Sequence, residues 1–127
     1  MRSLLADDER DFVETLAERL ALRGHTVRVV LDGPSALAAL EESQPDVLVL
    51  DWFMPGMSGL DVLERVSVIY PALPVILLTG HGQMEDGDDI PQAQARIVLT
   101  KPLRFETFLE ILEDAVHGTF QRQGGDS

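Results

Sequence analysis

Five polar side chains stand at the ends of short apolar runs in this sequence, and their types suit one kind of chemistry. They are Asp7, Asp8, Asp51, Thr79 and Lys101. Carboxylates are hard oxygen ligands that suit magnesium, which takes only one or two of them from a protein and keeps several waters. A carboxylate also accepts a phosphoryl group directly and forms an aspartyl phosphate. A lysine and a hydroxyl beside such a carboxylate would bind the phosphoryl oxygens.

Asp51 has the most informative surroundings of the five. It follows an unbroken apolar run, residues 47–50, and the turn-forming pair Pro55-Gly56 comes soon after it. Such a run, ended by a breaker, predicts a strand buried on both faces, as in parallel sheets. Ligands of open α/β sheets bind outside the carboxyl ends of the strands. A lone Asp after a strand is more often a loop cap, so a chemical role for Asp51 depends on what converges on it.

The other apolar segments predict an α/β protein. Further strands are expected at residues 3–6, 26–30, 74–79 and 97–99. Apolar residues at helical spacing predict helices at residues 10–22, 35–43, about 60–70 and about 105–116. This alternation is the pattern of a doubly wound, five-stranded parallel sheet with helices on both faces. Gly87 and Pro91 disfavour a regular helix within residues 83–95, so the fourth helix is expected to be short or irregular.

In such a sheet the carboxyl ends of all strands lie on one edge, which would bring the five polar side chains together. Carboxylates that share a site raise one another's pKa, and a divalent cation relieves their repulsion. Each residue also has a structural explanation. Asp7 and Asp8 suit the start of a helix, Thr79 could be a strand-end hydroxyl, and Lys101 a solvated side chain. Separate structural roles for all of these residues, at four strand ends, are less economical than one shared site.

Composition limits the functions open to this chain. Its 127 residues suit one domain, and its formal net charge of −12 argues against binding nucleic acid or anionic lipid. No apolar run is long enough for a membrane span or a signal peptide, so the cytoplasm is the default location. The chain has no cysteine, which excludes disulfides and thiolate metal sites.

These residues together resemble the response-regulator receiver domain of two-component signalling. The likeness covers residues 2 to about 117, and its motifs are the pair Asp7-Asp8, the stretch from Leu50 to Gly59 around Asp51, Thr79-Gly80 and Lys101-Pro102. The resemblance implies a flavodoxin-like sheet of strand order 2-1-3-4-5. It also implies magnesium-dependent transfer of phosphate to Asp51 from a sensor histidine kinase or phosphotransfer protein.

The resemblance further implies a ligand set for the metal. Asp8, Asp51 and the backbone carbonyl of Phe53 would hold Mg²⁺, and Asp7 would contact it through water. Thr79 and Lys101 would act on the phosphoryl group. The sequence Thr-Gly-His-Gly at residues 79–82 is similar to that of one receiver subgroup.

Three features depart from the family pattern. Val98 stands where relatives carry the Tyr or Phe that changes rotamer on activation, so the usual coupling to Thr79 does not carry over. The irregular fourth helix falls within the surface, formed by helix four, strand five and helix five, that receivers offer to downstream partners; residues 83–94 are expected to be the least ordered internal segment. Phe53 and His81 would flank the phosphoryl group, where the Phe53 ring shields it from water and His81 has a modest role.

The remaining expectations concern organisation and rivals. A receiver domain is expected over residues 1–120 and a flexible tail over 121–127, as a monomer or weak dimer. The chain is either a stand-alone receiver or a part of a larger regulator or hybrid kinase. A magnesium-dependent phosphohydrolase is disfavoured because Phe53 stands where it would need a second carboxylate; an inactive pseudo-receiver or a flavin module would lack the acidic pair. Ser58 is expected to cap a helix, and His25 and His117 to be surface residues.

Overall fold

The computed structural model describes residues 1–80 and 95–117, and its centre is one five-stranded parallel sheet. The strand order is β2-β1-β3-β4-β5. The strands are β1 (Arg2–Ala6), β2 (Thr26–Val30), β3 (Val47–Asp51), β4 (Val75–Thr79) and β5 (Ala95–Thr100). The helices are α1 (Arg10–Leu22), α2 (Gly33–Glu42), α3 (Gly59–Ile69) and α4 (Phe105–His117). The predicted fold class and strand order are therefore confirmed.

Helix α4 is the last of the helices predicted from the sequence. The segment expected to form a short or irregular fourth helix, residues 83–94, lies outside the described residues, as do His81 and the expected tail at 121–127. Within the described ranges, no helix has both the length and the apolar character needed to cross a membrane.

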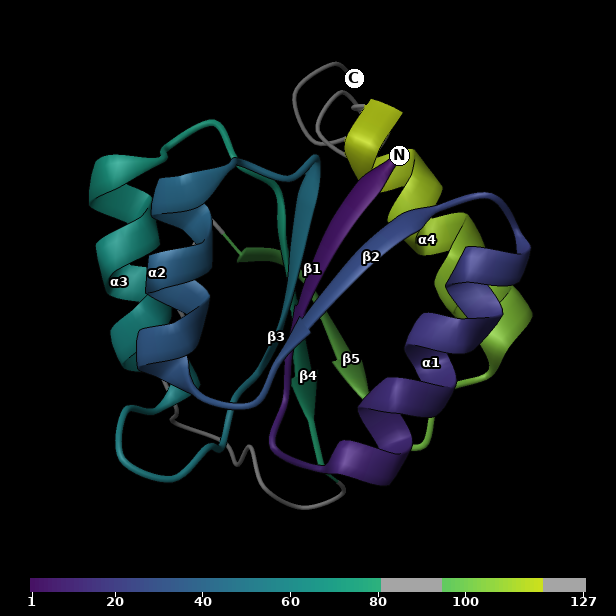
Figure 1. Cartoon of the computed structure of the whole chain (residues 1–127), viewed down its shortest axis with the longest axis horizontal. Helices are drawn as coiled ribbons and strands as arrows, with labels where there is room; N and C mark the ends of the chain where they lie inside the picture. The colour runs from purple at the N-terminus through teal and green to yellow at the C-terminus, as the bar shows by residue number, and fades with distance from the viewer. Residues whose placement is uncertain (81–94, 118–127) are drawn as a thin grey trace.

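The helices cover the sheet in two pairs, with α2 and α3 on one face and α1 and α4 on the other (Figure 1). Alternate residues of each strand feed the two cores. On β3, Leu48 and Leu50 pack toward α2 and α3, whereas Val47 and Val49 pack toward α1 and α4. Because both faces are covered, the central strands are apolar throughout, which is why they read as continuous runs.

Local sequence signals set where two of the helices begin. The Asp32 side chain accepts a hydrogen bond from the Ser35 N–H at 2.7 Å and caps α2. Ser58 and Asp61 form a reciprocal capping box at the start of α3. The predicted cap at Ser58 is confirmed, and it fixes the point at which the chain leaves the loop after Asp51.

The two outer strands differ from the central three. Strand β2 is half-exposed along its length, and this explains the less continuous apolar pattern of its sequence. At the other edge, Val98 of β5 is exposed at 41%.

The prediction that His25 is a surface residue was wrong. His25 lies between α1 and β2, is 8% exposed, and its Nε2 lies 3.4 Å from Glu113 Oε2 on α4. Helix α4 covers His25. Because the contact joins residues 88 positions apart, 25 and 113, the sequence around His25 gives no sign of its burial.

Candidate functional site

The parallel register brings the ends of four strands to one edge of the sheet, the lower edge in Figure 1. Ala6 of β1 is aligned with Leu50 of β3, so Asp7 and Asp51 both follow directly from paired positions. Thr79 of β4 is aligned with Thr100 of β5, and the Lys101 N–H donates to the Thr79 carbonyl at 2.7 Å. The sequence-predicted edge therefore exists, and it carries all five polar residues.

Three carboxylates gather at this edge. Asp7 and Asp51 are 1% and 4% exposed, whereas Asp8 is open to solvent. One oxygen atom from each of the three lies within 4.8 Å of the other two. Such a group of hard oxygen donors, with one side open to water, matches what magnesium requires.

Lys101 lies among these carboxylates. Its Nζ is 2.9 Å from Asp7 Oδ2 and 3.9 Å from Asp51 Oδ2. It also donates a hydrogen bond to Glu9 Oε1, and it stands 4.5 Å from the centroid of the Phe12 ring. Lys101 is thus already paired with carboxylates at the mouth of the site. Its contacts with Asp7 and Glu9 are shorter than its distance to Asp51.

The electrostatics of the site favour a cation or a proton. Burial, reinforced by the negative charge of Asp7, raises the pKa of Asp51 to about 7, although Lys101 acts in the opposite direction. Burial also raises the pKa of Asp7 above its ordinary value. Burial lowers the pKa of Lys101, but its contacts with Glu9 and Asp7 outweigh this and leave the pKa above its ordinary value. Asp51 therefore holds its negative charge at some cost near neutral pH.

The loop between β3 and α3 folds tightly back onto Asp51. Gly56 has a φ of +80°, which a residue with a side chain rarely adopts. A Cβ on Gly59 would lie only 2.4 Å from the Asp51 carbonyl oxygen, so no side chain fits there. The Phe53 N–H donates to the Asp51 carboxylate, which lowers its pKa, and the Phe53 side chain is 45% exposed. The loop therefore holds Phe53 at the mouth of the site.

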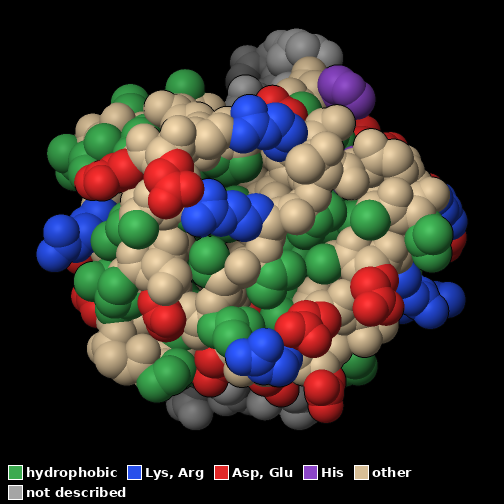
Figure 2. All heavy atoms as spheres, in the orientation of Figure 1, with side chains coloured by type: hydrophobic (Ala, Val, Ile, Leu, Met, Phe, Trp, Pro, Cys, Tyr) green, Lys and Arg blue, Asp and Glu red, His purple; other side chains and the backbone are tan. Residues whose placement is uncertain are grey.

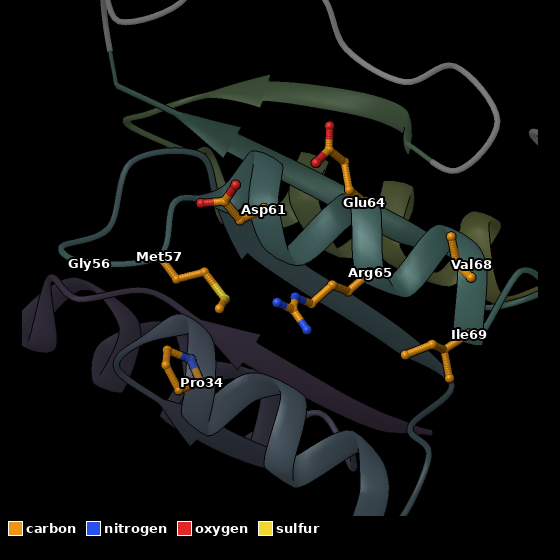
Figure 3. A pocket seen from close by; sticks show the side chains of 8 residues that line it. All are labelled: Pro34, Gly56, Met57, Asp61, Glu64, Arg65, Val68 and Ile69. Carbon is orange, nitrogen blue, oxygen red and sulfur yellow. The ribbon is translucent and has the colours of Figure 1, made fainter.

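A hollow of about 560 Å³ opens above Asp51. It is lined by Asp8, Glu9, Phe12, Asp51, Phe53, Gly80, Lys101 and Pro102. A larger hollow of about 830 Å³ lies between α2 and α3 (Figure 3). There Met57 and Arg65 point into the gap, while Asp61 and Glu64 point away from it, and no buried carboxylate lines it. The hollow above Asp51 is the candidate functional site because of the side chains that line it, although it is the smaller of the two.

One face of the molecule mixes charges of the two signs. On the face shown in Figure 2, acidic side chains are interspersed with basic and with apolar side chains. The gathering of Asp7, Asp8 and Asp51 differs from the mixed charges of this face.

Comparison with known proteins identifies this arrangement. The sequence model of the response regulator receiver domain matches residues 4–113. The chain belongs to the response regulator receiver domain family. The resemblance found from the motifs at Asp7-Asp8, Asp51, Thr79 and Lys101 is thereby confirmed.

Relatives of this receiver domain include regulators with further parts. The probable transcriptional regulatory protein TcrX of Mycobacterium tuberculosis is 40% identical over 103 residues, which cover 81% of this chain and 44% of TcrX. The response regulator MprA of a Mycobacterium species is 31% identical over 127 residues, which cover 100% of this chain and 55% of MprA. The receiver thus spans about half the length of these curated relatives.

Solved structures show the same fold. The receiver domain of NtrX from Brucella abortus superposes with a TM-score of 0.83 at 31% identity, covering 91% of this chain and 98% of that one. The response regulator TrrA from Thermotoga maritima, in complex with Mg²⁺ and BeF, superposes with a TM-score of 0.80 at 29% identity, covering 90% of this chain and 97% of that one.

Sequence reasoning named most of this receiver's site and missed two parts of it. Asp7, Asp8, Asp51, Thr79, Lys101 and Phe53 lie at the predicted edge. Glu9 and Phe12, which contact Lys101, were not singled out. Their positions within the first residues after Asp8 were the available signal, since the start of α1 must border the strand ends. Val98 lies on the outer strand, and His81 lies outside the described residues.

The donor set fits a magnesium ion. Asp7 Oδ2 is buried and pairs with Lys101, yet it accepts no hydrogen bond of normal geometry within the described residues. An oxygen atom in that position can accept from a metal-bound water. The exposed Asp8 and the raised pKa of Asp51 fit the same interpretation, because a cation would offset the repulsion among the three carboxylates.

Proposed function

We propose that this receiver accepts a phosphoryl group on Asp51 from the phosphohistidine of a sensor histidine kinase or a phosphotransfer protein, with magnesium as cofactor. The observation that carries the proposal is the convergence of Asp7, Asp8, Asp51 and Lys101 on one hollow at the carboxyl edge of the sheet. The transcriptional regulators and the Mg²⁺–BeF complex among its relatives support it.

The metal would be held by the carboxylates of Asp8 and Asp51 and by the Phe53 carbonyl, with Asp7 accepting from a bound water. When bound, it supplies positive charge that screens the incoming phosphoryl oxygens from the carboxylates. Asp7 has a second task, because its charge fixes Lys101 beside Asp51 at 2.9 Å from its own Oδ2.

In the transfer step, an Asp51 carboxylate oxygen attacks phosphorus. An Asp51 Oδ–P bond forms while the P–N bond of the phosphohistidine breaks. The imidazole, already protonated on its other ring nitrogen, leaves with the electron pair of the P–N bond as neutral imidazole. Lys101, which stands 3.9 Å from Asp51, binds one phosphoryl oxygen, and the Thr79 hydroxyl donates to another. The buried, raised-pKa carboxylate is a stronger base than an exposed one, and this favours its attack.

The acyl phosphate carries a charge of about −1.5 to −2 at neutral pH, in place of the single negative charge of the Asp51 carboxylate, and places it beside Lys101 and Thr79. Closing of these two residues on the new group would move the ends of β4 and β5. Val98 lies exposed on β5, so a partner bound there would contact a surface that moves with β5, although Val98 has no aromatic ring. We expect the output surface to include β5 and α4, together with the segment between β4 and β5.

The Phe53 side chain would shield the acyl phosphate from water. It is 45% exposed at the mouth of the hollow, so it is placed to cover a group bound to Asp51. His81 would have a modest role, orienting a water or screening charge on the far side. We expect the acyl phosphate on Asp51 to hydrolyse slowly in the wild type. Hydrolysis should be faster in Phe53→Asn.

Incubation with acetyl phosphate tests the proposal without the cognate kinase. We expect the mass of one phosphoryl group to be added in the presence of Mg²⁺ and to be absent with chelator or in Asp51→Asn. Asp11→Asn, an exposed aspartate of α1, is the matched control and should be phosphorylated as the wild type is. Incorporation that is equal in Asp51→Asn, or independent of the metal, would refute the proposal.

A further inference from the structure

Lys101 is held in place by contacts on the α1 side as well as by the carboxylates at the carboxyl edge of the sheet. It is the only lysine in the sequence, and its side chain is 12% exposed. Its Nζ pairs with Asp7, donates to Glu9 and stands over the Phe12 ring at 4.5 Å. Asp51, the group it must serve, is the more distant neighbour at 3.9 Å.

Glu9 stands at a helix start but does not cap the helix. It occupies the N-cap position of α1, where a side-chain oxygen usually accepts from a backbone N–H of the first turn. The Glu9 side chain makes no such bond, and its carboxylate reaches instead to Lys101, 92 residues later in the sequence. Its backbone N–H donates to Asp7 Oδ1 at 2.8 Å. Glu9 therefore joins both partners of the buried ion pair.

The geometry defines a competition for one ammonium group. When a phosphoryl group is bound to Asp51, Lys101 must contact an anion on the Asp51 side of the hollow. The Glu9 carboxylate lines the same hollow and binds the same Nζ from the side of α1. Asp7 Oδ2 lies 2.9 Å from the same Nζ, so the ion pair with Asp7 and the hydrogen bond to Glu9 together hold the amine toward α1.

We propose that Glu9 is a positioning residue that retains Lys101 in an open-site position and so lowers the affinity of the site for a phosphoryl group. This inference rests on the proposed phosphoacceptor function and adds to it a brake supplied by the first residue before α1. The Phe12 ring supports the same open position by lying beneath the ammonium.

The size of the effect follows from the exposure of the pair. The Glu9 side chain is 60% exposed, so its ion pair with Lys101 belongs to the weak class of surface pairs. Removing the competitor should therefore raise the affinity for a phosphoryl mimic by about two- to fivefold. The substitution Glu9→Gln also removes a negative charge near the metal site, so the affinity for Mg²⁺ in the absence of the mimic should fall slightly. If Glu9 had a purely structural role, Glu9→Gln would lower both the affinity for the mimic and the affinity for Mg²⁺.

The test is a titration of beryllofluoride at saturating Mg²⁺, followed by the fluorescence of Trp52, the only tryptophan and the residue after Asp51. We expect Glu9→Gln to bind the mimic about two- to fivefold more tightly than the wild type. Glu14→Gln is the matched control, because it removes the same charge from the exposed face of α1, where Glu14 pairs with Arg10 at 3.2 Å. Glu14→Gln should bind as the wild type does.

A double-mutant cycle separates competition for Lys101 from a general charge effect. In the Lys101→Met background, Glu9→Gln should leave the affinity unchanged, because the amine for which Glu9 competes is gone. In protein labelled with ¹⁵N at the lysine Nζ, the single side-chain signal should shift in Glu9→Gln before any mimic is added, and should stay in place in Glu14→Gln.

Failure of this inference and failure of the proposed function look different. If the wild type binds beryllofluoride and Glu9→Gln binds it equally or more weakly, Glu9 is not a brake and only the inference falls. An equal gain in the Lys101→Met background also overturns it. If the wild type does not bind beryllofluoride with Mg²⁺, the phosphoacceptor function falls, and the brake with it.

Discussion

The two ends of the sheet both bury polar groups, but they treat them differently. At the carboxyl end, Lys101 lies within ion-pair distance of both Asp7 and Asp51, and Lys101 and Asp51 border a hollow open to solvent. At the amino end, Ser3 Oγ and His25 Nδ1 are buried and have no hydrogen-bond partner within the described residues. His25 Nε2 lies 3.4 Å from Oε2 of the half-exposed Glu113.

The difference shows that burial of a polar group does not by itself mark a site. The polar atoms of the amino end, Ser3 Oγ and His25 Nδ1, do not gather into a cluster of charged groups, although Ser3 lines a small hollow. Those of the carboxyl end converge, because parallel strands all deliver their following residues to one edge. Burial, reinforced by the nearby charge of Asp7, raises the pKa of Asp51 to about 7, and a cation bound beside these carboxylates would offset this shift.

The largest contrast between the two ends should be in magnesium binding. Asp8→Asn removes one of the proposed metal ligands, so we expect the Mg²⁺ affinity to fall by at least about tenfold, the lower end of the losses found even for residues that only support a metal ligand. Isothermal titration at pH 8 measures it. Ser3→Ala, at the amino end, is the control and should bind Mg²⁺ as the wild type does. If Asp8→Asn bound Mg²⁺ as tightly as the wild type does, the carboxyl end would not differ from the amino end in metal binding.

The next effect concerns stability and its dependence on pH. The pKa of Asp51 is about 7 in the folded protein against 3.8 ordinarily, so the folded state holds a proton that the unfolded state releases between these values. The metal-free wild type should therefore lose stability as pH rises from about 4 to 7. Asp51→Asn avoids this loss and should be more stable at pH 8 by about 1 to 3 kcal/mol, since the open side of the site screens part of the effect.

Urea unfolding with chelator at pH 8 and pH 5 measures this prediction. The advantage of Asp51→Asn should shrink at pH 5, where Asp51 of the wild type is largely protonated in the folded state. An advantage of the same size at both pH values, or a loss of stability at pH 8, would contradict the account of the carboxyl end. Added Mg²⁺ should stabilise the wild type more than the variant.

The smallest expected effect is at the amino end. The Ser3 hydroxyl is 2% exposed without a partner, and a buried unsatisfied polar group costs free energy. Ser3→Ala should therefore raise the free energy of unfolding by up to about 1 kcal/mol. Denaturant unfolding measures it. A loss of more than that amount would show that Ser3 has a partner and that the two ends are more alike than proposed.

The sequence predicted the fold because its signals were local. Unbroken apolar runs at β3 and β4 indicated strands buried on both faces, and the half-exposed edge strand β2 had the less continuous pattern that such strands show. The cap at Ser58 followed from residue type and position. Burial of His25 was not predictable in this way, because it depends on how α4 crosses the sheet.

The site was predicted in outline for a different reason. Once the sheet is parallel, Asp7, Asp51, Thr79 and Lys101 must share an edge, whatever the details of packing. The contacts of Lys101 with Glu9 and Phe12 required the path of α1 across the edge, and no periodicity in the sequence indicates that path. Sequence patterns thus locate the proposed reacting groups, and tertiary packing decides how tightly they are held.

Chemical mapping of the phosphorylated residue is the most direct test of the central claim. After reaction with acetyl phosphate and Mg²⁺, borohydride reduces an aspartyl phosphate to homoserine, which mass spectrometry of peptides locates. The account predicts homoserine at position 51 and at no other aspartate. Homoserine at position 7 or 8, or an intact Asp51 in protein that carries a phosphoryl group, would contradict it.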